Sequence, residues 1–387
     1  MRRILFRGFL VLLVVLAGVA LWKRDDLARL YAVNTLFDED RIVANFIHMD
    51  ALFHTRPMQT RRGPPSPLPT AVNPVTLPEG TEAWLEARNA TSLVILRRGE
   101  IVHEDYRKGT EAGDLRISWS VAKSVLAALF GIALDEGAIA SINDPVTDYA
   151  PALAGSAYDG ATIRNVLNMA SGVEFDEDYL DFWSDINKMG RVVALGGSLD
   201  DFAAGIKARR APPGREWHYV SIDTHVLGML LRGATGRSVP DLMEEKLFGP
   251  LGLGADPYYV TDGEGIAFVL GGLNMTSRDF ARFGQMIAQG GEWQGKQIVP
   301  ASWVTAMTAE SAPWQDGQMA RYGFQWWLPN DAGPGEAFAI GVYGQYIWVD
   351  RARGVVIVKT AADRGFQEPG VFEDNIAMFR KLVEAVQ

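Results

Sequence analysis

The sequence predicts an α/β protein of the α+β kind. Its antiparallel sheet is formed by both ends of the domain, is flanked by helices and carries an inserted, mostly helical lobe. Strand-like segments occur in pairs near both ends of residues 79–387, and residues 118–312 between them have the composition of helices and loops. Strands that bracket a helical region can complete one sheet, so we expect the two ends of the domain to pair. An N-terminal membrane helix is expected to precede this domain.

Length and composition favour a well-packed enzyme-sized domain and exclude several function classes. The chain has 387 residues, 48% of them hydrophobic, which is enough to bury a large core. Its net charge of -10 comes without a basic stripe, so a nucleic-acid partner is not expected. The absence of cysteine excludes disulfides and thiolate chemistry, and the 5 histidines show no metal-ligand spacing. We therefore predict neither a metal nor a cofactor.

The first residues predict a signal anchor or transmembrane helix over residues 1–24. Arg2 and Arg3 precede a segment of 19 residues, Ile4 to Trp22, that is apolar apart from Gly8, Gly18 and one charged residue, Arg7, near its start. A membrane-spanning helix needs about 20 such residues. The arginines are expected to stay in the cytoplasm, which puts the domain in the periplasm of a single-pass protein of the bacterial inner membrane. Cleavage of the segment and release into the periplasm is the alternative.

Residues 25–78 predict an N-terminal extension followed by a proline-rich linker. Apolar residues such as Phe37, Phe46 and Phe53 alternate with charged ones, as in a segment that drapes over a domain. Residues 56–78, which include Arg61 and Arg62, are rich in proline and therefore favour extended backbone. The compact domain is expected over residues 79–387.

Two hairpins are predicted at the two ends of this domain. Residues 92–96 and 101–106 read as strands joined by a turn at Gly99. A second pair covers residues 345–349 and 355–360. A final helix is predicted from an apolar face at helical spacing, formed by Ile376, Phe379, Leu382, Val383 and Val386.

The helix predicted to run from Ser120 toward Asp135 carries the first chemical signal. Lys123 follows Ser120 by three residues, so both side chains lie on one helical face. A serine hydroxyl is a weak nucleophile until a neighbour takes its proton. Such a pair also occurs in ordinary surface helices, as an N-capping serine and a solvated lysine. Here the apolar surroundings indicate a half-buried Lys123, whose pKa burial lowers toward the range of a base.

Four further segments carry a family pattern: residues 213–221, 245–253, 271–279 and 322–327. Together with the Ser120–Lys123 pair, their order and spacing resemble the class C β-lactamase-like serine hydrolases. The resemblance covers about residues 85–385 and implies a β-lactamase/transpeptidase-like fold. Because of Gly341-Val342-Tyr343-Gly344-Gln345, the chain is similar in particular to the branch of 6-aminohexanoate-dimer hydrolases and β-lactamase-like esterases.

The resemblance implies specific roles for individual residues. Ser120 corresponds to the nucleophile and Lys123 to its partner, while Tyr219 corresponds to the tyrosine of a Tyr-x-Asn motif in which Ser221 replaces the asparagine. The backbone N–H groups of Ser120 and Val342 correspond to the oxyanion hole. The sequence does not decide which of Lys123 and Tyr219 is the resting base.

The third family motif falls on Ala339-Ile340-Gly341, followed by Tyr343, and these residues are expected to bind substrate. Penicillin-recognising relatives carry a cation where this chain has Ala339. Tyr179 is expected to line the cleft, although an exposed loop aromatic is the alternative. An arginine from elsewhere, such as Arg321, is a possible substitute for the missing cation.

These observations predict a serine hydrolase that acts through an acyl-enzyme on ester or linear amide bonds of small molecules. A β-lactamase or D-Ala-D-Ala peptidase is the alternative within the family. An alternative of another class is a non-catalytic, membrane-anchored binding or sensor protein of the same fold. The Gly-x-Ser-x-Gly elbow of Ser-His-Asp hydrolases is absent from the sequence.

Overall fold

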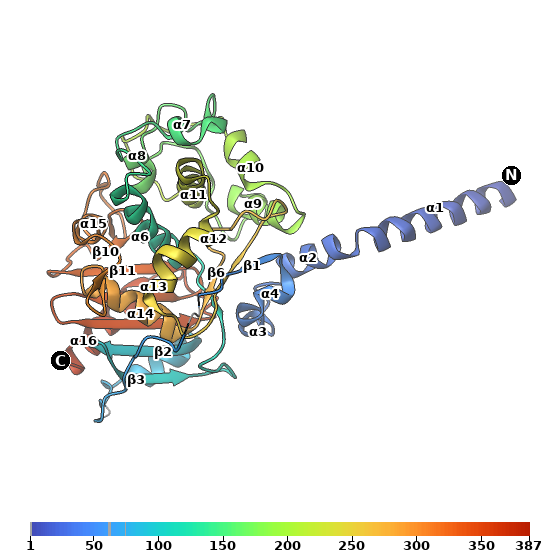
Figure 1. Cartoon of the computed structure of the whole chain (residues 1–387). Helices are drawn as coiled ribbons and strands as arrows, with labels where there is room; N and C mark the ends of the chain where they lie inside the picture. Colours follow the sequence, from blue (N-terminus) through green and yellow to red (C-terminus); the bar gives the residue numbers. More distant parts are fainter. Residues whose placement is uncertain (1, 61–62, 74) are drawn as a thin grey trace.

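The computed structural model describes residues 2–60, 63–73 and 75–387. A seven-stranded antiparallel sheet lies at its centre, with strand order β3-β2-β13-β12-β11-β10-β9 (Figure 1). Its strands are β2 (Ala90–Arg97), β3 (Glu100–Tyr106), β9 (Arg321–Tyr322), β10 (Trp327–Leu328), β11 (Glu336–Gly341), β12 (Gln345–Asp350) and β13 (Val355–Ala361).

The predicted pairing of the two ends of the domain is confirmed. Strand β2 pairs antiparallel with β13, with Ile95 opposite Ile357. Each predicted hairpin is also present, since β2 pairs with β3 and β12 with β13. Gly99 adopts a φ of 87° in the turn before β3, a left-handed conformation that glycine reaches without steric cost. The sheet thus joins the two ends of the domain around the helical lobe.

Helices cover both faces of this sheet, and each face has its own apolar core. Helices α5 (Thr81–Ala87) and α16 (Val371–Ala385) pack on one face, where Trp84 meets Phe379 at 5.7 Å between ring centroids. Helices α6 (Val121–Asp135) and α14 (Ser277–Ala288) lie on the other face. The predicted C-terminal helix is confirmed, because its apolar face is buried against the sheet.

The inserted lobe is mostly helical, as predicted, and lies above the sheet in Figure 1. A second sheet of four short strands, in the order β1-β5-β6-β4, links the lobe to the chain before it. Strands this short carry no readable periodicity in the sequence, and they were not predicted. The remaining elements are α7 (Val146–Tyr149), a 3-10 turn (Pro151–Leu153), α8 (Ile163–Leu167), α9 (Asp185–Ala194), α10 (Leu199–Gly205), α11 (Ser221–Thr235), α12 (Val239–Leu242), a π-helical turn (Met243–Phe248), α13 (Gly249–Leu251), α15 (Ala301–Met307), β1 (Thr55–Pro57), β4 (Arg116–Ile117), β5 (Tyr258–Val260), β6 (Leu273–Met275), β7 (Glu292–Trp293) and β8 (Lys296–Gln297).

The N-terminal extension forms α1 (Arg2–Trp22), α2 (Arg24–Asn34), α3 (Ile42–Ile47) and α4 (Met49–Leu52), and α1 projects away from the domain (Figure 1). The predicted single membrane span is not supported: in the described part of the chain, no single helix has the length and apolar character to cross a membrane. The segments Leu5–Val19 and Arg24–Asn34, bent by 73°, have that length and composition only as a pair. Arg61, Arg62 and Pro74 of the predicted linker lie outside the described residues.

Candidate active site

The Ser-x-x-Lys pair lies at the start of α6. Ser120 is the N-cap residue of this helix, and Lys123 is in its first turn. The Nζ atom of Lys123 lies 2.8 Å from the Oγ atom of Ser120 and donates to the carbonyl oxygen of Leu270 at 2.7 Å. Lys123 is 1% exposed, and burial lowers its pKa to about 7. A lysine with this pKa is substantially neutral at neutral pH and has a lone pair that can accept a proton.

Tyr219 completes the group that the sequence predicted. Its hydroxyl interacts with the hydroxyls of Ser120 and Ser221. Its ring centroid lies 5.4 Å from the Nζ atom of Lys123, and the ring packs at 5.3 Å from that of Trp327. Burial raises the pKa of Tyr219 well above its usual value, so this hydroxyl stays protonated at neutral pH.

Glu177 is a site residue that the sequence did not single out. Its carboxylate accepts hydrogen bonds from the backbone N–H of Ser221 at 3.0 Å, from the hydroxyl of Ser221, and from the hydroxyl of Tyr179 at 2.7 Å. Its negative charge also raises the pKa of Lys123, against the larger effect of burial. Because Asp176 and Asp178 flank it, the sequence offers no way to select this carboxylate over its neighbours.

Strand β11 runs directly beside the start of α6. A methyl group at Gly341 would lie 2.6 Å from the carbonyl oxygen of Ser118 and 3.1 Å from the backbone nitrogen of Ser120. Only a glycine therefore lets the strand approach the segment of Ser120 this closely. The next residue, Val342, lines the same cavity as Ser120.

The two backbone N–H groups predicted for the oxyanion hole are available for a ligand. Within the described ranges, neither Ser120 nor Val342 donates its backbone N–H to another protein group. Each adjoins a residue in the left-handed region, since Trp119 has a φ of 44° and Tyr343 a φ of 60°. Strain of this kind is typical of backbone that the surrounding structure holds in place for function.

The predicted substrate-binding residues divide into two groups. Tyr179, Ser221 and Tyr343 line the cavity at Ser120, whereas Ala339, Ile340 and Gly341 do not. Ala339 is fully buried in the core between the sheet and helices α6 and α14, and Ile340 packs toward the opposite core. Successive side chains of β11 enter the two apolar cores of the sheet, so the buried side chain of Ala339 does not face the cavity, whereas contact of the partly exposed Ile340 with substrate stays a prediction.

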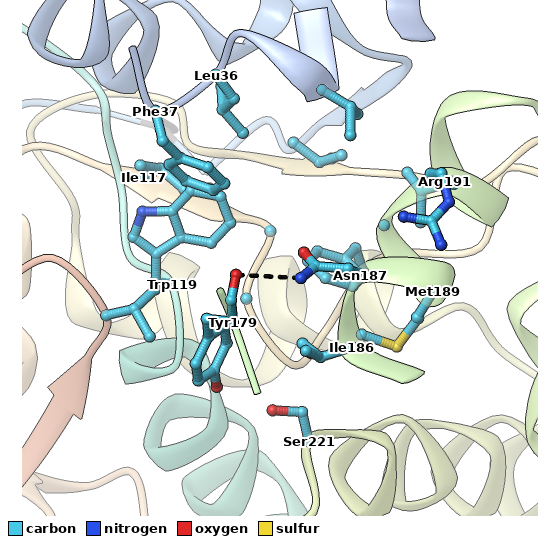
Figure 2. Close-up of a pocket in the computed structure, with 18 of the residues that line it drawn as sticks. Leu36, Phe37, Ile117, Trp119, Tyr179, Ile186, Asn187, Met189, Arg191 and Ser221 are labelled. Atoms are coloured by element: carbon cyan, nitrogen blue, oxygen red, sulfur yellow. Dashed lines mark hydrogen bonds between the residues drawn. The ribbon is translucent and has the colours of Figure 1, made fainter. Parts of the chain in front are cut away.

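The cavity itself has a volume of about 290 Å³, and the N-terminal extension forms part of its wall (Figure 2). Leu36, Phe37, Met49 and Phe53 of this extension contribute apolar wall. The ring of Phe37 stacks on that of Tyr343 at 4.5 Å between centroids. The sequence predicted that this segment drapes over the domain but gave no sign that it forms a wall of the site.

Metal chemistry finds no support in the side chains present. Among the described residues, no group of three or more His, Cys, Asp or Glu could hold a metal ion. Arg321 pairs with Glu310 and does not line the cavity, so it does not replace the cation missing at Ala339. The arrangement can instead activate a serine hydroxyl, since it combines a buried amine, a protonated phenol and two unpaired N–H groups.

Comparison with known proteins agrees with this geometry. Residues 82–374 match the family model described as Beta-lactamase. The 6-aminohexanoate-dimer hydrolase of Paenarthrobacter ureafaciens is 31% identical over 323 residues, covering 78% of this chain and 81% of that protein. A Bacillus anthracis structure, provisionally described as a 6-aminohexanoate-dimer hydrolase, matches with a TM-score of 0.79 and 22% identity, covering 91% of this chain and 96% of that one. A family VIII carboxylesterase matches with a TM-score of 0.59 and 19% identity, covering 80% and 97% of the two chains.

Proposed function

The chain belongs to the beta-lactamase family, and from this premise we propose that it hydrolyses ester or linear amide bonds of small substrates through an acyl-enzyme on Ser120. One observation carries the proposal. The Nζ atom of Lys123, with its pKa lowered to about 7, lies 2.8 Å from the Ser120 hydroxyl at the wall of the cavity. A buried neutral amine at this distance is a competent base for serine.

Acylation follows from the protonation states of the two partners. Lys123 accepts the hydroxyl proton while Ser120 Oγ forms a bond to the substrate carbonyl carbon. The oxyanion that develops is stabilised by the N–H groups of Ser120 and Val342. Tyr219 remains protonated and donates its proton to the departing alkoxide or amine, and the proton on Lys123 then restores the phenol. This assigns the resting base to Lys123, which the sequence had left open.

Deacylation reverses these roles with water as the nucleophile. A water molecule attacks the ester carbonyl carbon as Lys123, now neutral again, accepts its proton through Tyr219. The bond between the carbonyl carbon and Ser120 Oγ breaks, and Oγ takes back the proton from Lys123, which returns both groups to the resting state. The product acid leaves, and no cofactor is consumed.

The charged side chains at the cavity indicate which class of substrate it can bind. A penicillin carries a carboxylate close to the scissile bond, and an unmatched buried charge costs several kcal/mol. Ala339 supplies no cation at that place, and Arg321 is engaged with Glu310 outside the cavity. Arg191 does line the cavity, but it lies across the cavity from Trp119 and so away from the scissile bond (Figure 2). We therefore favour esters and linear amides over β-lactams and D-Ala-D-Ala peptides. The relatives named for 6-aminohexanoate dimers and carboxylic esters agree with this choice.

A panel on the purified protein from residue 25 onward tests the proposal. It contains p-nitrophenyl acyl esters, a 6-aminohexanoate dimer, a D-Ala-D-Ala peptide and a chromogenic cephalosporin, beside labelling by a fluorophosphonate with peptide mapping. We expect label on Ser120 and turnover of the esters. Absence of both label and ester turnover would favour a non-catalytic binding or sensor protein, and efficient turnover of the cephalosporin alone would favour a β-lactamase.

The pH dependence of ester hydrolysis gives a specific prediction. Protonated Lys123 cannot accept the proton of Ser120, so kcat/KM is expected to fall as the pH drops below about 7. In Glu177→Gln the negative charge that stabilises the ammonium is lost. The pKa of Lys123 then falls, and the acid limb of the profile moves to lower pH, with a lower plateau because Ser221 and Tyr179 lose part of their acceptor.

Lys359→Met is the matched control for this profile. Lys359 lies on β13, is also buried with its pKa lowered to about 7, and donates to the Oδ1 atom of Asn375 at 2.9 Å. It does not line the cavity. Its replacement should leave the midpoint of the acid limb in place. A midpoint that does not respond to Glu177→Gln, or one that moves to higher pH, would contradict the assignment of Lys123 as the base.

The periplasmic location stays a proposal that rests on the arginines before the apolar segment. We expect the full-length protein to sediment with membranes, and its domain to be accessible to protease from the periplasmic side. A mature protein whose sequence begins near Leu21 would indicate cleavage and release instead.

A further inference from the structure

One charged side chain faces the otherwise apolar cavity. Among the described residues that line it, Arg191 is the only one that carries a charge at neutral pH. Its walls are otherwise built from aliphatic and aromatic side chains together with a few neutral polar groups. A cation in such surroundings acts strongly on a ligand, because the apolar walls screen charge poorly.

Arg191 is held in place but is not neutralised. It lies on α9, where one of its Nη atoms donates to the carbonyl oxygen of Phe182 at 2.8 Å. Its guanidinium carbon lies 4.1 Å from the ring centroid of Phe182. In the described part of the chain, no carboxylate lies within 4.0 Å of it. The guanidinium therefore keeps free donors and a net charge, and its packing on the ring limits its movement.

Its place in the cavity separates it from the reacting atoms. Figure 2 shows Arg191 across the pocket from Trp119, the residue that precedes Ser120. Ile186 and Met189 of the same helix line the space near it. A ligand that extends from Ser120 to Arg191 must therefore be apolar in its middle and must end in a group that a guanidinium can bind.

We propose that this cavity binds a linear acyl chain whose far end is a carboxylate, held by Arg191, so that the enzyme prefers monoesters or monoamides of α,ω-dicarboxylic acids. The inference rests on the proposed function, because it specifies the acyl half of the substrate. Guanidinium and carboxylate form paired hydrogen bonds of matching geometry. A charged hydrogen bond of this kind is worth about a tenfold to a hundredfold change in affinity.

Two considerations assign the acyl half to this cavity. In the acyl-enzyme the acyl chain stays bonded to Ser120, whereas the alcohol or amine must depart to solvent. A cavity that begins at Ser120 and is partly covered by the N-terminal extension suits the part that stays. The net charge of -10 also makes the protein as a whole repel anions, so a preference for an anionic chain has to come from a local cation.

Three p-nitrophenyl esters of similar length test the proposal: the hexanoate, the hydrogen adipate and the 6-aminohexanoate, which end in a methyl, a carboxylate and an ammonium group. We expect wild-type kcat/KM to be highest for the adipate monoester and lowest for the aminohexanoate. Arg191→Gln should lower kcat/KM for the adipate about tenfold, mainly through KM, and leave the hexanoate within twofold. Arg191→Glu should favour the aminohexanoate.

Lys188→Gln is the matched control. Lys188 lies on the same helix, pairs with Asp185 at 3.0 Å and does not line the cavity, so its loss removes the same charge without touching the site. The inference would be overturned if both glutamine variants had equal effects, or if Arg191→Gln left the ratio of kcat/KM for the adipate to that for the hexanoate unchanged. In either case, turnover of the hexanoate would still support the proposed function. Failure of wild type to cleave any of the three esters would instead sink the proposed function, and the inference with it.

Discussion

Ser120→Ala is expected to lose ester turnover by a factor of about 10⁴ to 10⁶, and to lose all covalent labelling. Its Oγ atom is the only group on the described cavity wall that lies at hydrogen-bond distance from a buried amine. Without it, no acyl-enzyme forms, and only the N–H groups of the oxyanion hole and substrate binding assist water. The measurement is kcat for p-nitrophenyl hexanoate, beside mass spectrometry after fluorophosphonate treatment.

Ser124→Ala provides the control on the same helix. The hydroxyl of Ser124 donates to the carbonyl oxygen of Gln325 at 2.6 Å and is buried away from the cavity. Its loss should cost some stability and leave labelling in place. Thermal unfolding of both variants checks that the fold is retained. Label that persists in Ser120→Ala, or that maps to another residue, would show that the nucleophile has been wrongly assigned.

The part of the site that could be predicted from the sequence is the part that local geometry determines. Ser120 and Lys123 are three residues apart on one helix, so their proximity follows from helical periodicity alone. The hairpins at the two ends of the domain could also be predicted from the sequence, because β2, β12 and β13 carry continuous apolar runs. Tyr219 could be placed only through the family resemblance, since no local pattern brings it to Ser120.

What the sequence could not provide depends on distant contacts. Glu177 lies among several acidic residues, and only its hydrogen bonds with Ser221 distinguish it. The cavity wall contributed by Phe37 depends on stacking with Tyr343, which is far away in the sequence. Ala339 was placed at the substrate by motif position, but its side chain enters the core between the sheet and helices α6 and α14. In each case, the packing of separate segments decides the role.

Gly341→Ala is expected to lower kcat by a factor of about 10² to 10³, the loss that follows removal of one oxyanion-hole donor. The added methyl group would lie 2.6 Å from the carbonyl oxygen of Ser118 and 3.1 Å from the backbone nitrogen of Ser120. Both contacts are with backbone, which cannot rotate away. Strand β11 must therefore shift, and the N–H groups of Ser120 and Val342 no longer converge on one oxygen.

A suitable control is Gly205→Ala, because a methyl group there meets no atom within 4 Å. The two variants are compared by kcat and KM for p-nitrophenyl hexanoate and by the rate of fluorophosphonate labelling. Loss of the oxyanion hole should lower kcat and slow labelling, with a much smaller change in KM, because the acyl cavity remains. If Gly341→Ala keeps full kcat, the oxyanion does not lie between these two N–H groups. If only its thermal stability falls, the close approach of β11 to Ser120 serves packing and not catalysis.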